Sequence, residues 1–209
     1  MVLTQLKHDN AGHMARFNQT RLVDALLTNR ITAQNVHTLL ACVQAVSNHF
    51  QEALVTCYSF TRHPILKSIA QIHLSEEIGH NHTLLADRQY EPPMWDPVIE
   101  SSATWFTHQM IVQDDLLKAL LMYWVLEKCA NLFFMHASEK IDALIPTHFF
   151  DIHRHDQDTH AHLWEDLLTS STLDYQHLST NLKQAWEIIF IAADHIADIT
   201  LKTPTLSLV

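Results

Sequence analysis

Glycine is nearly absent from this chain, which has only Gly12 and Gly79 among its 209 residues. Average usage of about 7% would give roughly fifteen. Hairpin turns, phosphate-binding loops and dinucleotide-binding fingerprints need glycine for a positive φ or for close approach of the backbone. The shortage of glycine therefore excludes a turn-rich β fold and most nucleotide-dependent enzymes.

The small numbers of cysteine and of basic residues also limit what kind of protein this can be. Three cysteines, Cys42, Cys57 and Cys129, are widely spaced and odd in number, which argues against a disulfide framework and favours buried thiols in a reducing compartment. The 13 Lys and Arg against 23 Asp and Glu give a formal charge of −10, which argues against nucleic acid as a partner. Because the sequence has neither a signal peptide nor an apolar run of about 18 residues, we expect a cytoplasmic protein without a membrane segment.

Between the few helix-breaking residues, apolar side chains recur at spacings of three and four, which is typical of amphipathic helices. We expect one all-α domain over residues 1–209, with a polar start of about residues 1–15 and a tail of about 202–209. About seven helices with short loops predict an antiparallel bundle, a fold whose core often holds metals or cofactors. The predicted helices cover about 15–29, 32–62, 64–89, 97–112, 114–145, 147–169 and 172–201.

The third predicted helix contains the segment HLSEEIGH at residues 73–80. His73, Glu77 and His80 are related by i, i+4 and i+7 and therefore share one helix face. Glu-x-x-His is the carboxylate and imidazole pair that helical bundles use for iron. Gly79 lies inside this predicted helix, where its missing side chain could admit close packing or a ligand. A polar helix face with a chance pair is the alternative interpretation.

The sixth predicted helix carries two sets of His and Asp residues at i, i+3 and i+7. His153, Asp156 and His160 form the first set, and the second set begins two residues later, a rotation of about 200°. Leu163 and Leu167 continue the stripe of the first set, so we expect that set to face the core. A hydrophilic face that binds metal only adventitiously is the alternative.

Glu127 follows a run of apolar and aromatic residues in the fifth predicted helix. A buried carboxylate is costly unless it is paired or bound to a metal, so a core position for Glu127 would require a cation. The alternative is a surface side chain beside Lys128. Tyr123, one turn earlier, would lie close to such a metal and is our candidate catalytic residue. In the second predicted helix, His49 or Glu52 could add a ligand.

The donor residues and the order of their motifs resemble a known superfamily. The HLSEEIGH run, the later lone Glu127 and the Asp-x-x-x-His at residues 156–160 resemble the haem-oxygenase-like di-iron oxidases and oxygenases, a group that includes TenA-like and pyrroloquinoline-quinone-synthase-like proteins. The resemblance spans roughly residues 20–200 and implies a TenA-like bundle. It also implies iron ligands at Glu77, His80, Glu127, Asp156 and His160, with His153 as a further ligand and His73 in place of a carboxylate. In some members the last carboxylate stands one position later, where this chain has Gln157.

Oxygen and nitrogen donors without thiolate favour iron or manganese over structural zinc. We therefore expect a non-haem iron enzyme with one or two ferrous ions and O₂ as co-substrate. Its substrate would be a small organic, amino-acid-like or fatty-acid-like molecule, in a cavity that Tyr123, Trp124, Phe133 and Phe134 could line. Two alternatives stay open: a non-catalytic bundle that binds a protein or small molecule with a degenerate metal site, and a metal-independent TenA-like hydrolase that uses Cys129. A homodimer would be ordinary for such a bundle.

Overall fold

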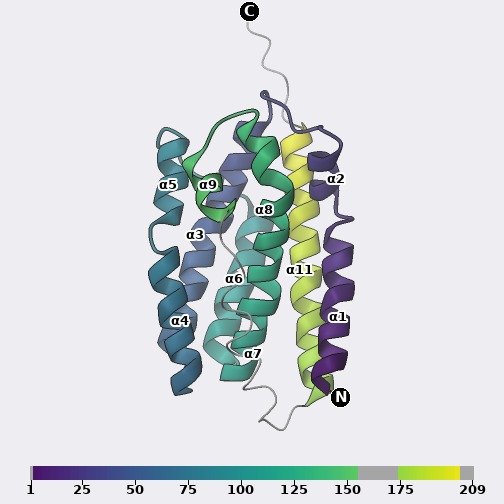
Figure 1. Ribbon diagram of the computed structural model, residues 1–209, viewed down its shortest axis with the longest axis vertical. Coiled ribbons are helices and arrows are strands. Elements are labelled where there is room, and N and C mark those ends of the chain that lie inside the picture. The colour runs from purple at the N-terminus through teal and green to yellow at the C-terminus, as the bar shows by residue number, and fades with distance from the viewer. Residues whose placement is uncertain (1, 155–173, 203–209) are drawn as a thin grey trace, which may run out of the picture.

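A computed structural model describes residues 2–154 and 174–202 of the chain, and every regular element in these residues is a helix. The long helices run side by side along one axis, and the first and last helices are neighbours that both begin at the lower end of Figure 1. The elements are α1 (Val2–Phe17), α2 (Arg21–Leu27), α3 (Val36–Phe60), α4 (Pro64–Glu77), α5 (His80–Asp87), α6 (Pro97–Val112), α7 (Asp115–Ala119), the π-helix η1 (Leu120–Leu126), α8 (Glu127–Asp142), α9 (His148–Arg154) and α11 (Tyr175–Lys202).

Local capping signals fix the starts of the middle helices. The Asp96 carboxylate accepts hydrogen bonds from the backbone amides of Val98, at 2.8 Å, and Ile99, at 3.1 Å, and Pro97 occupies the first helical turn. Asp114 caps α7 by accepting from the amide of Leu117 at 2.9 Å. Both starts agree with the sequence prediction, because a cap and its amide partners lie within a few residues of each other.

The N-terminal region differs from the prediction. Residues 2–17 form α1, where we expected a polar start, and the helix expected over 15–29 is divided into the end of α1 and the short α2. The polar residues of α1 are stabilised by α11: Asn10 accepts a hydrogen bond from the buried indole of Trp186 at 2.8 Å, and Asp9 accepts from the hydroxyl of Tyr175 at 2.7 Å. Sequence periodicity missed α1 because these partners lie far away in the chain.

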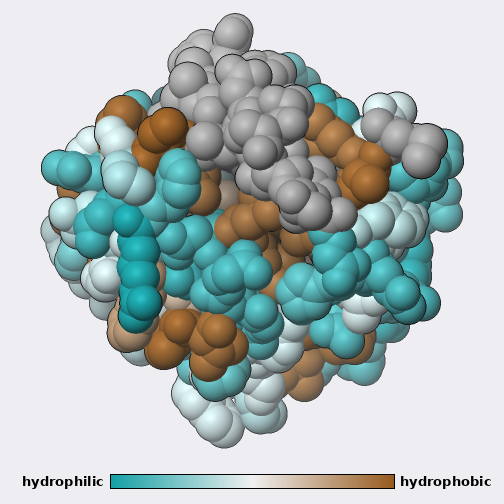
Figure 2. Space-filling view, turned by 90° about the horizontal axis from the view of Figure 1, so that it is seen from below, coloured by the Kyte–Doolittle hydropathy of each residue, from teal (hydrophilic) through white to brown (hydrophobic). Residues whose placement is uncertain are grey.

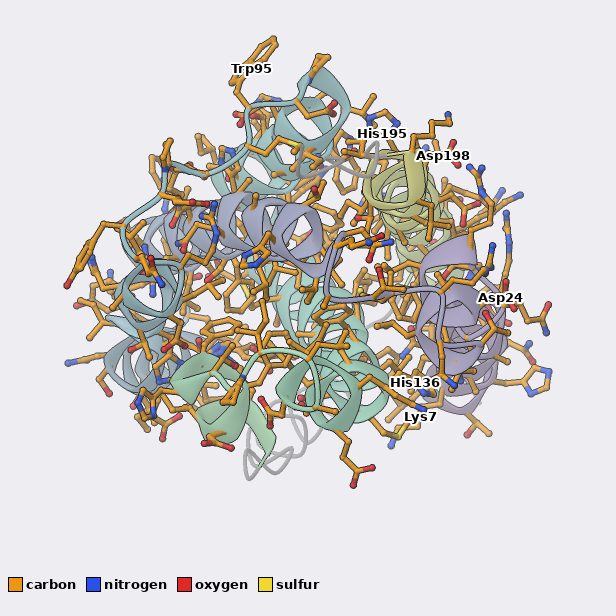
Figure 3. All side chains as sticks on the ribbon, turned by 90° about the horizontal axis from the view of Figure 1, so that it is seen from above. Lys7, Asp24, Trp95, His136, His195 and Asp198 are labelled. Atoms are coloured by element: carbon orange, nitrogen blue, oxygen red, sulfur yellow. The ribbon has the colours of Figure 1, made fainter. Side chains whose placement is uncertain are left out.

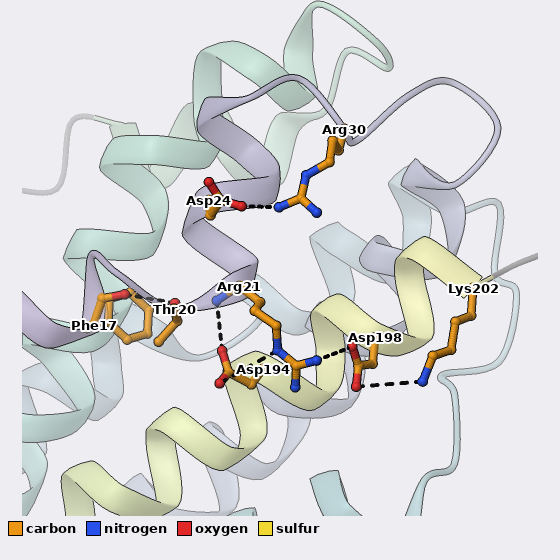
Figure 4. Close-up of polar contacts among 8 residues, drawn as sticks. All are labelled: Phe17, Thr20, Arg21, Asp24, Arg30, Asp194, Asp198 and Lys202. Atoms are coloured by element: carbon orange, nitrogen blue, oxygen red, sulfur yellow. Dashed lines mark hydrogen bonds and ion pairs between the residues drawn. The ribbon is translucent and has the colours of Figure 1, made fainter.

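Charged side chains join α2 to α11 at the surface (Figure 4). Arg21 donates through its backbone amide to Asp194 at 2.7 Å and through its guanidinium to Asp198 at 2.5 Å. Lys202 also lies 3.7 Å from Asp198. Because exposed ion pairs contribute about 0–1 kcal/mol each, these contacts orient α2 more than they stabilise the fold.

The helix expected over 64–89 is divided into α4 and α5, so the expectation that Gly79 lies inside a helix is wrong. Gly79 has φ +99°, a left-handed conformation that side chains other than glycine's rarely adopt. A Cβ built on Gly79 would meet nothing within 4 Å, so the backbone angle and not close packing requires glycine here. On the neighbouring α3, Gln51 donates to the carbonyl of Glu77 at 2.7 Å, and Gln44 donates to the carbonyl of Asn81 at 2.9 Å.

The helix expected over 114–145 also departs from regular α geometry. Leu120–Leu126 form the π-helix η1, and its residues from Leu120 to Val125 are all buried. π-helical turns are rare and frequently lie at functional sites. The π-helix ends directly before Glu127, so it sets the direction in which that carboxylate leaves the helix.

The surface of the bundle carries both polar and apolar side chains. At the lower end of the molecule, apolar patches are separated by polar side chains (Figure 2), and the exposed apolar residues at the ends of α3, α4 and α6 are Phe60, Ile65, Ile111 and Val112. Seen from above, Trp95 extends outward just before α6, while His195 lies on α11 (Figure 3). No helix among the described residues has the length and apolar character needed to cross a membrane.

Candidate metal site and cavity

Three of the predicted ligands come together where α4, α5 and α9 meet. Glu77 is the last residue of α4, His80 the first of α5, and His153 lies on α9. Glu77 Oε2 lies 3.0 Å from His80 Nδ1 and 3.9 Å from His153 Nε2, and one donor atom from each of the three residues lies within 4.8 Å of the others. Among the described residues, this is the group of three or more donor side chains that could hold a metal ion.

The backbone and the aromatic neighbours orient the imidazole of His153. Its Nδ1 lies 2.9 Å from the carbonyl oxygen of Phe149, an acceptor, so Nδ1 carries the proton and donates. The ring stacks on Phe134, with centroids 4.2 Å apart, and packs against Phe149, with centroids 4.4 Å apart. Nε2 is therefore left with its lone pair on the side of Glu77. A hydrogen bond that fixes the tautomer in this way is the usual support of a metal-binding histidine.

Glu77 is buried, with 8% of its surface exposed. Burial alone would raise the pKa of its carboxyl, but the hydrogen bond from His80 and the electrostatic influence of the neighbouring His153, His80 and His73 side chains outweigh burial and hold the pKa below its ordinary value. The residue is therefore an ionised carboxylate surrounded by imidazoles. That combination provides hard oxygen and borderline nitrogen donors at one point.

A second pair lies beside the first. His73 Nε2 is 2.6 Å from Glu127 Oε1, and the His73 ring lies between Phe50 and Tyr123, with centroids 5.9 and 5.7 Å away. Burial tends to lower the pKa of His73, but the hydrogen bond and charge of Glu127, with the charge of Glu77, raise it above its ordinary value. Glu127 is half-buried, and the partner that the structure places at its carboxylate is His73, whose raised pKa favours the protonated imidazole.

An apolar cavity of about 200 Å³ adjoins these residues. Side chains from α3, α6, α8 and α11 form most of its wall, and Glu77, Glu127 and His153 contribute polar atoms. Phe133 and Phe134, two of the four aromatic residues that could line a cavity, do line it. Tyr123 and Trp124 are not among the lining residues; both are buried in the core, and burial raises the pKa of the Tyr123 hydroxyl far above its ordinary value.

The remaining candidates lie elsewhere. His49 is at the cavity wall, but its Nδ1 is 3.0 Å from Glu52 and its Nε2 is 2.9 Å from Glu100, outside the group of Glu77, His80 and His153. Cys129 also lines the cavity, and burial raises its pKa to about 12. Asp156 and His160 lie outside the described residues.

Sequence reasoning missed the residues that support this site. Glu100 contacts His49, which lies 51 positions earlier in the sequence. Gln51 donates to the backbone carbonyl of Glu77 at the end of α4, which lies 26 positions later. Neither residue forms a short-range motif, because its partner lies on another helix. Phe149 orients His153 through its backbone carbonyl and its ring, and no sequence motif predicts such contacts.

Comparison with known proteins supports the fold assignment. No family model matches the chain. It is 27% identical over 203 residues to an uncharacterized protein of Rickettsia prowazekii (strain Madrid E), covering 95% of this chain and 96% of the other. A crystal structure of a TenA homologue from Pseudomonas syringae pv. tomato str. DC3000 superposes with a TM-score of 0.74 at 12% identity, covering 93% of this chain and 92% of that one. The predicted all-α, TenA-like fold is thereby confirmed.

Proposed function

We propose that the protein is a non-haem iron oxidoreductase that uses O₂ to oxidise a small organic molecule. The observation that carries this proposal is the grouping of two histidines and one carboxylate, His80, His153 and Glu77, at the wall of an apolar cavity. Two histidines and one carboxylate that leave coordination positions open are the donor set typical of O₂-activating ferrous enzymes.

The geometry of the three side chains fits a metal ion. Ligand atoms bound about 2.1 Å from an octahedral ion lie about 3 Å apart when adjacent and about 4 Å apart when opposite. The separations of 3.0 and 3.9 Å from Glu77 to the two imidazoles fall within this range. The ionised state of Glu77 and the tautomer of His153 both suit metal binding, and an ion at His80 Nδ1 would displace the proton that this atom donates to Glu77. Manganese would accept the same donors.

The residues around the proposed iron site have different roles in the reaction. Ferrous iron, when bound, supplies open positions for O₂ and one-electron redox chemistry. Phe133, Phe134 and Phe149 exclude water and hold an apolar substrate against the polar end of the cavity. His73 keeps a proton at Nε2 beside Glu127, within the same polar end. A second ion would draw on Glu127 together with Asp156 and His160.

The alternative of a cysteine-dependent TenA-like hydrolase has less support. A nucleophilic cysteine needs an accessible thiolate, which a neighbouring cation or a helix N-terminus usually stabilises. Burial instead raises the pKa of Cys129 to about 12, so the thiol stays protonated near neutral pH. We therefore assign Cys129 a packing role in the wall of the cavity.

The test is metal binding by matched histidine variants. We expect metal-free protein to bind Fe(II) under anaerobic conditions, and His80→Ala and His153→Ala each to lose at least about tenfold in affinity, since removal of even a supporting residue typically costs 10–100-fold. His82→Ala is the control, because His82 lies two residues from His80 and is exposed. Binding is read by titration calorimetry, and O₂ consumption is then compared in the same proteins.

Two results would contradict the proposal. The first is Fe(II) binding that His80→Ala and His153→Ala leave as tight as in the unmodified protein, which would place the metal elsewhere. The second is stoichiometric Fe(II) binding at this site with no O₂-dependent spectral change, which would favour the non-catalytic alternative with a degenerate site.

A further inference from the structure

The cavity beside the candidate metal site has an unusual distribution of charge. Its ionisable lining residues are Glu77, Glu127, His49 and His153, together with the thiol of Cys129. Among the described residues that line it there is no lysine or arginine. A site that binds a carboxylate or phosphate normally offers such a cation, most often an arginine that pairs with both oxygens.

The rest of the chain does not supply an obvious lysine or arginine for this cavity. Residues 155–173 contain no Lys or Arg, but they contain four acidic residues. The buried lysine and the buried arginine of the described residues are engaged elsewhere. Lys118 donates to the carbonyl of Phe60 at 2.7 Å and pairs with Asp115, and Arg88 donates to the carbonyl of Pro92 at 2.9 Å. The described lining of the cavity therefore offers two carboxylates and no lysine or arginine, with the His73 imidazole as the neighbour of Glu127.

Size and lining indicate the apolar part of a ligand. The cavity measures about 200 Å³, and an apolar cavity of about 150 Å³ is known to hold a benzene molecule. Its aromatic lining residues, which favour offset or edge contacts with another ring, are Phe17, Phe50, Phe106, Phe133, Phe134 and Phe149. A phenyl group with a two-carbon tail is a suitable size for this space.

Glu127 supplies the partner for the polar end of such a ligand. One of its oxygens lies 2.6 Å from His73, and a carboxylate can accept about four hydrogen bonds, so acceptor capacity is left for a ligand in the cavity. We propose that the cavity selects an apolar primary amine over a carboxylate of similar size, with Glu127 accepting a hydrogen bond from the ammonium group. This inference rests on the proposed function only in taking the cavity as the substrate site.

Three probes of nearly equal size test the inference: 2-phenylethylamine, 2-phenylethanol and phenylacetate. Their affinities are measured by titration calorimetry at neutral pH, both in metal-free protein and in protein loaded anaerobically with Fe(II). We expect the amine to bind roughly tenfold or more tightly than the alcohol, because both groups can donate to Glu127 but only the ammonium adds an opposite charge to that hydrogen bond. Phenylacetate should bind most weakly in metal-free protein.

Variants assign the effect to Glu127 and to the cavity. Glu127→Gln removes the charge and should abolish the advantage of the amine over the alcohol, while the affinity for the alcohol changes by less than about threefold. Glu139→Gln, an exposed change on the same helix, should leave all three affinities unchanged. Ala193→Leu, which fills the cavity from α11, should weaken all three probes by at least about tenfold while the circular dichroism of the helices is retained.

The outcomes separate this inference from the metal proposal. Preference for phenylacetate over the amine in either metal state, or no measurable binding of any probe, overturns it. Retention of the amine advantage in Glu127→Gln also overturns it. If Fe(II) fails to bind at His80 and His153 while the amine preference persists in metal-free protein, the metal proposal fails and the charge selection stands.

Discussion

The two glycines of this protein should respond to the same substitution with opposite signs. Gly79 has φ +99° between α4 and α5, whereas Gly12 lies within α1 without a positive φ. In both cases an added Cβ would meet nothing within 4 Å. Steric overlap therefore does not enter the comparison, and only the backbone conformation distinguishes Gly79→Ala from Gly12→Ala.

The magnitudes follow from the backbone. An alanine held at a left-handed φ costs about 1–3 kcal/mol, and loss of unfolded-chain entropy returns about 0.4–1 kcal/mol, so Gly79→Ala should lower the free energy of unfolding by about 1–2 kcal/mol. Gly12→Ala in a helix interior should raise it by about 0.5–1 kcal/mol. The two variants should therefore differ by about 2 kcal/mol. Gly79→Asn should lose less than Gly79→Ala, because asparagine tolerates a positive φ.

Urea unfolding at 25 °C, followed by circular dichroism at 222 nm, measures the difference. The same strain lies between Glu77 and His80, so Gly79→Ala should also weaken Fe(II) binding, while Gly12→Ala should not. Equal effects of the two alanine substitutions on the free energy of unfolding would refute the reasoning. So would a stabilising effect of Gly79→Ala, because it would mean that the chain continues as a regular helix through this position.

Three further variants test how individual polar contacts stabilise the bundle. Asn10→Ala should lower the free energy of unfolding by about 1–3 kcal/mol, because it leaves the buried indole N–H of Trp186 without its acceptor. Arg21→Ala removes an exposed side-chain contact with Asp198 and should cost less than about 1 kcal/mol. Equal losses in the two variants would contradict this reasoning. Burial raises the pKa of Asp96, but the hydrogen bonds from His195 and two backbone amides outweigh it, so the pKa lies below its ordinary value of 3.8. The stability that ionised Asp96 contributes is thus fully present above about pH 4 and is lost as the pH falls through its pKa in the folded protein. Unmodified protein should therefore lose more stability in acid than Asp96→Ala does, as measured by unfolding curves at a series of pH values. Equal losses in the two proteins would contradict this role of Asp96.

Local features of the sequence predicted much of the fold. The start of α6 follows from Asp96 and Pro97, because a cap and the amides that it accepts from are adjacent in the chain. The pair of Glu77 and His80 was predicted for the same reason, since three residues along the chain keep both side chains together even though the helix breaks between them. The break itself was missed because a glycine within an apolar repeat does not reveal its φ.

The other parts of the site depend on contacts between distant segments. His153 reaches Glu77 only because α9 packs against α5. The candidate ligand His49 contacts Glu100 because α3 packs against α6. A core position for Glu127 was expected to require a cation, and the structure places the imidazole of His73 beside its carboxylate. A single sequence records which side chains are available and carries no information on which of seventeen histidines meets a given carboxylate.

The sequence by itself determined that this chain is helical, because scarcity of glycine and apolar spacings of three and four are properties of short segments. It also supplied a local carboxylate and imidazole pair of the kind that binds iron. Only the tertiary structure decided that His153 lies beside this pair, that His73 contacts Glu127, and that an apolar cavity lined by the two carboxylates adjoins them. The physical reason is that packing of apolar helix faces brings together residues 54 or 76 positions apart, and the polar contacts follow from that packing.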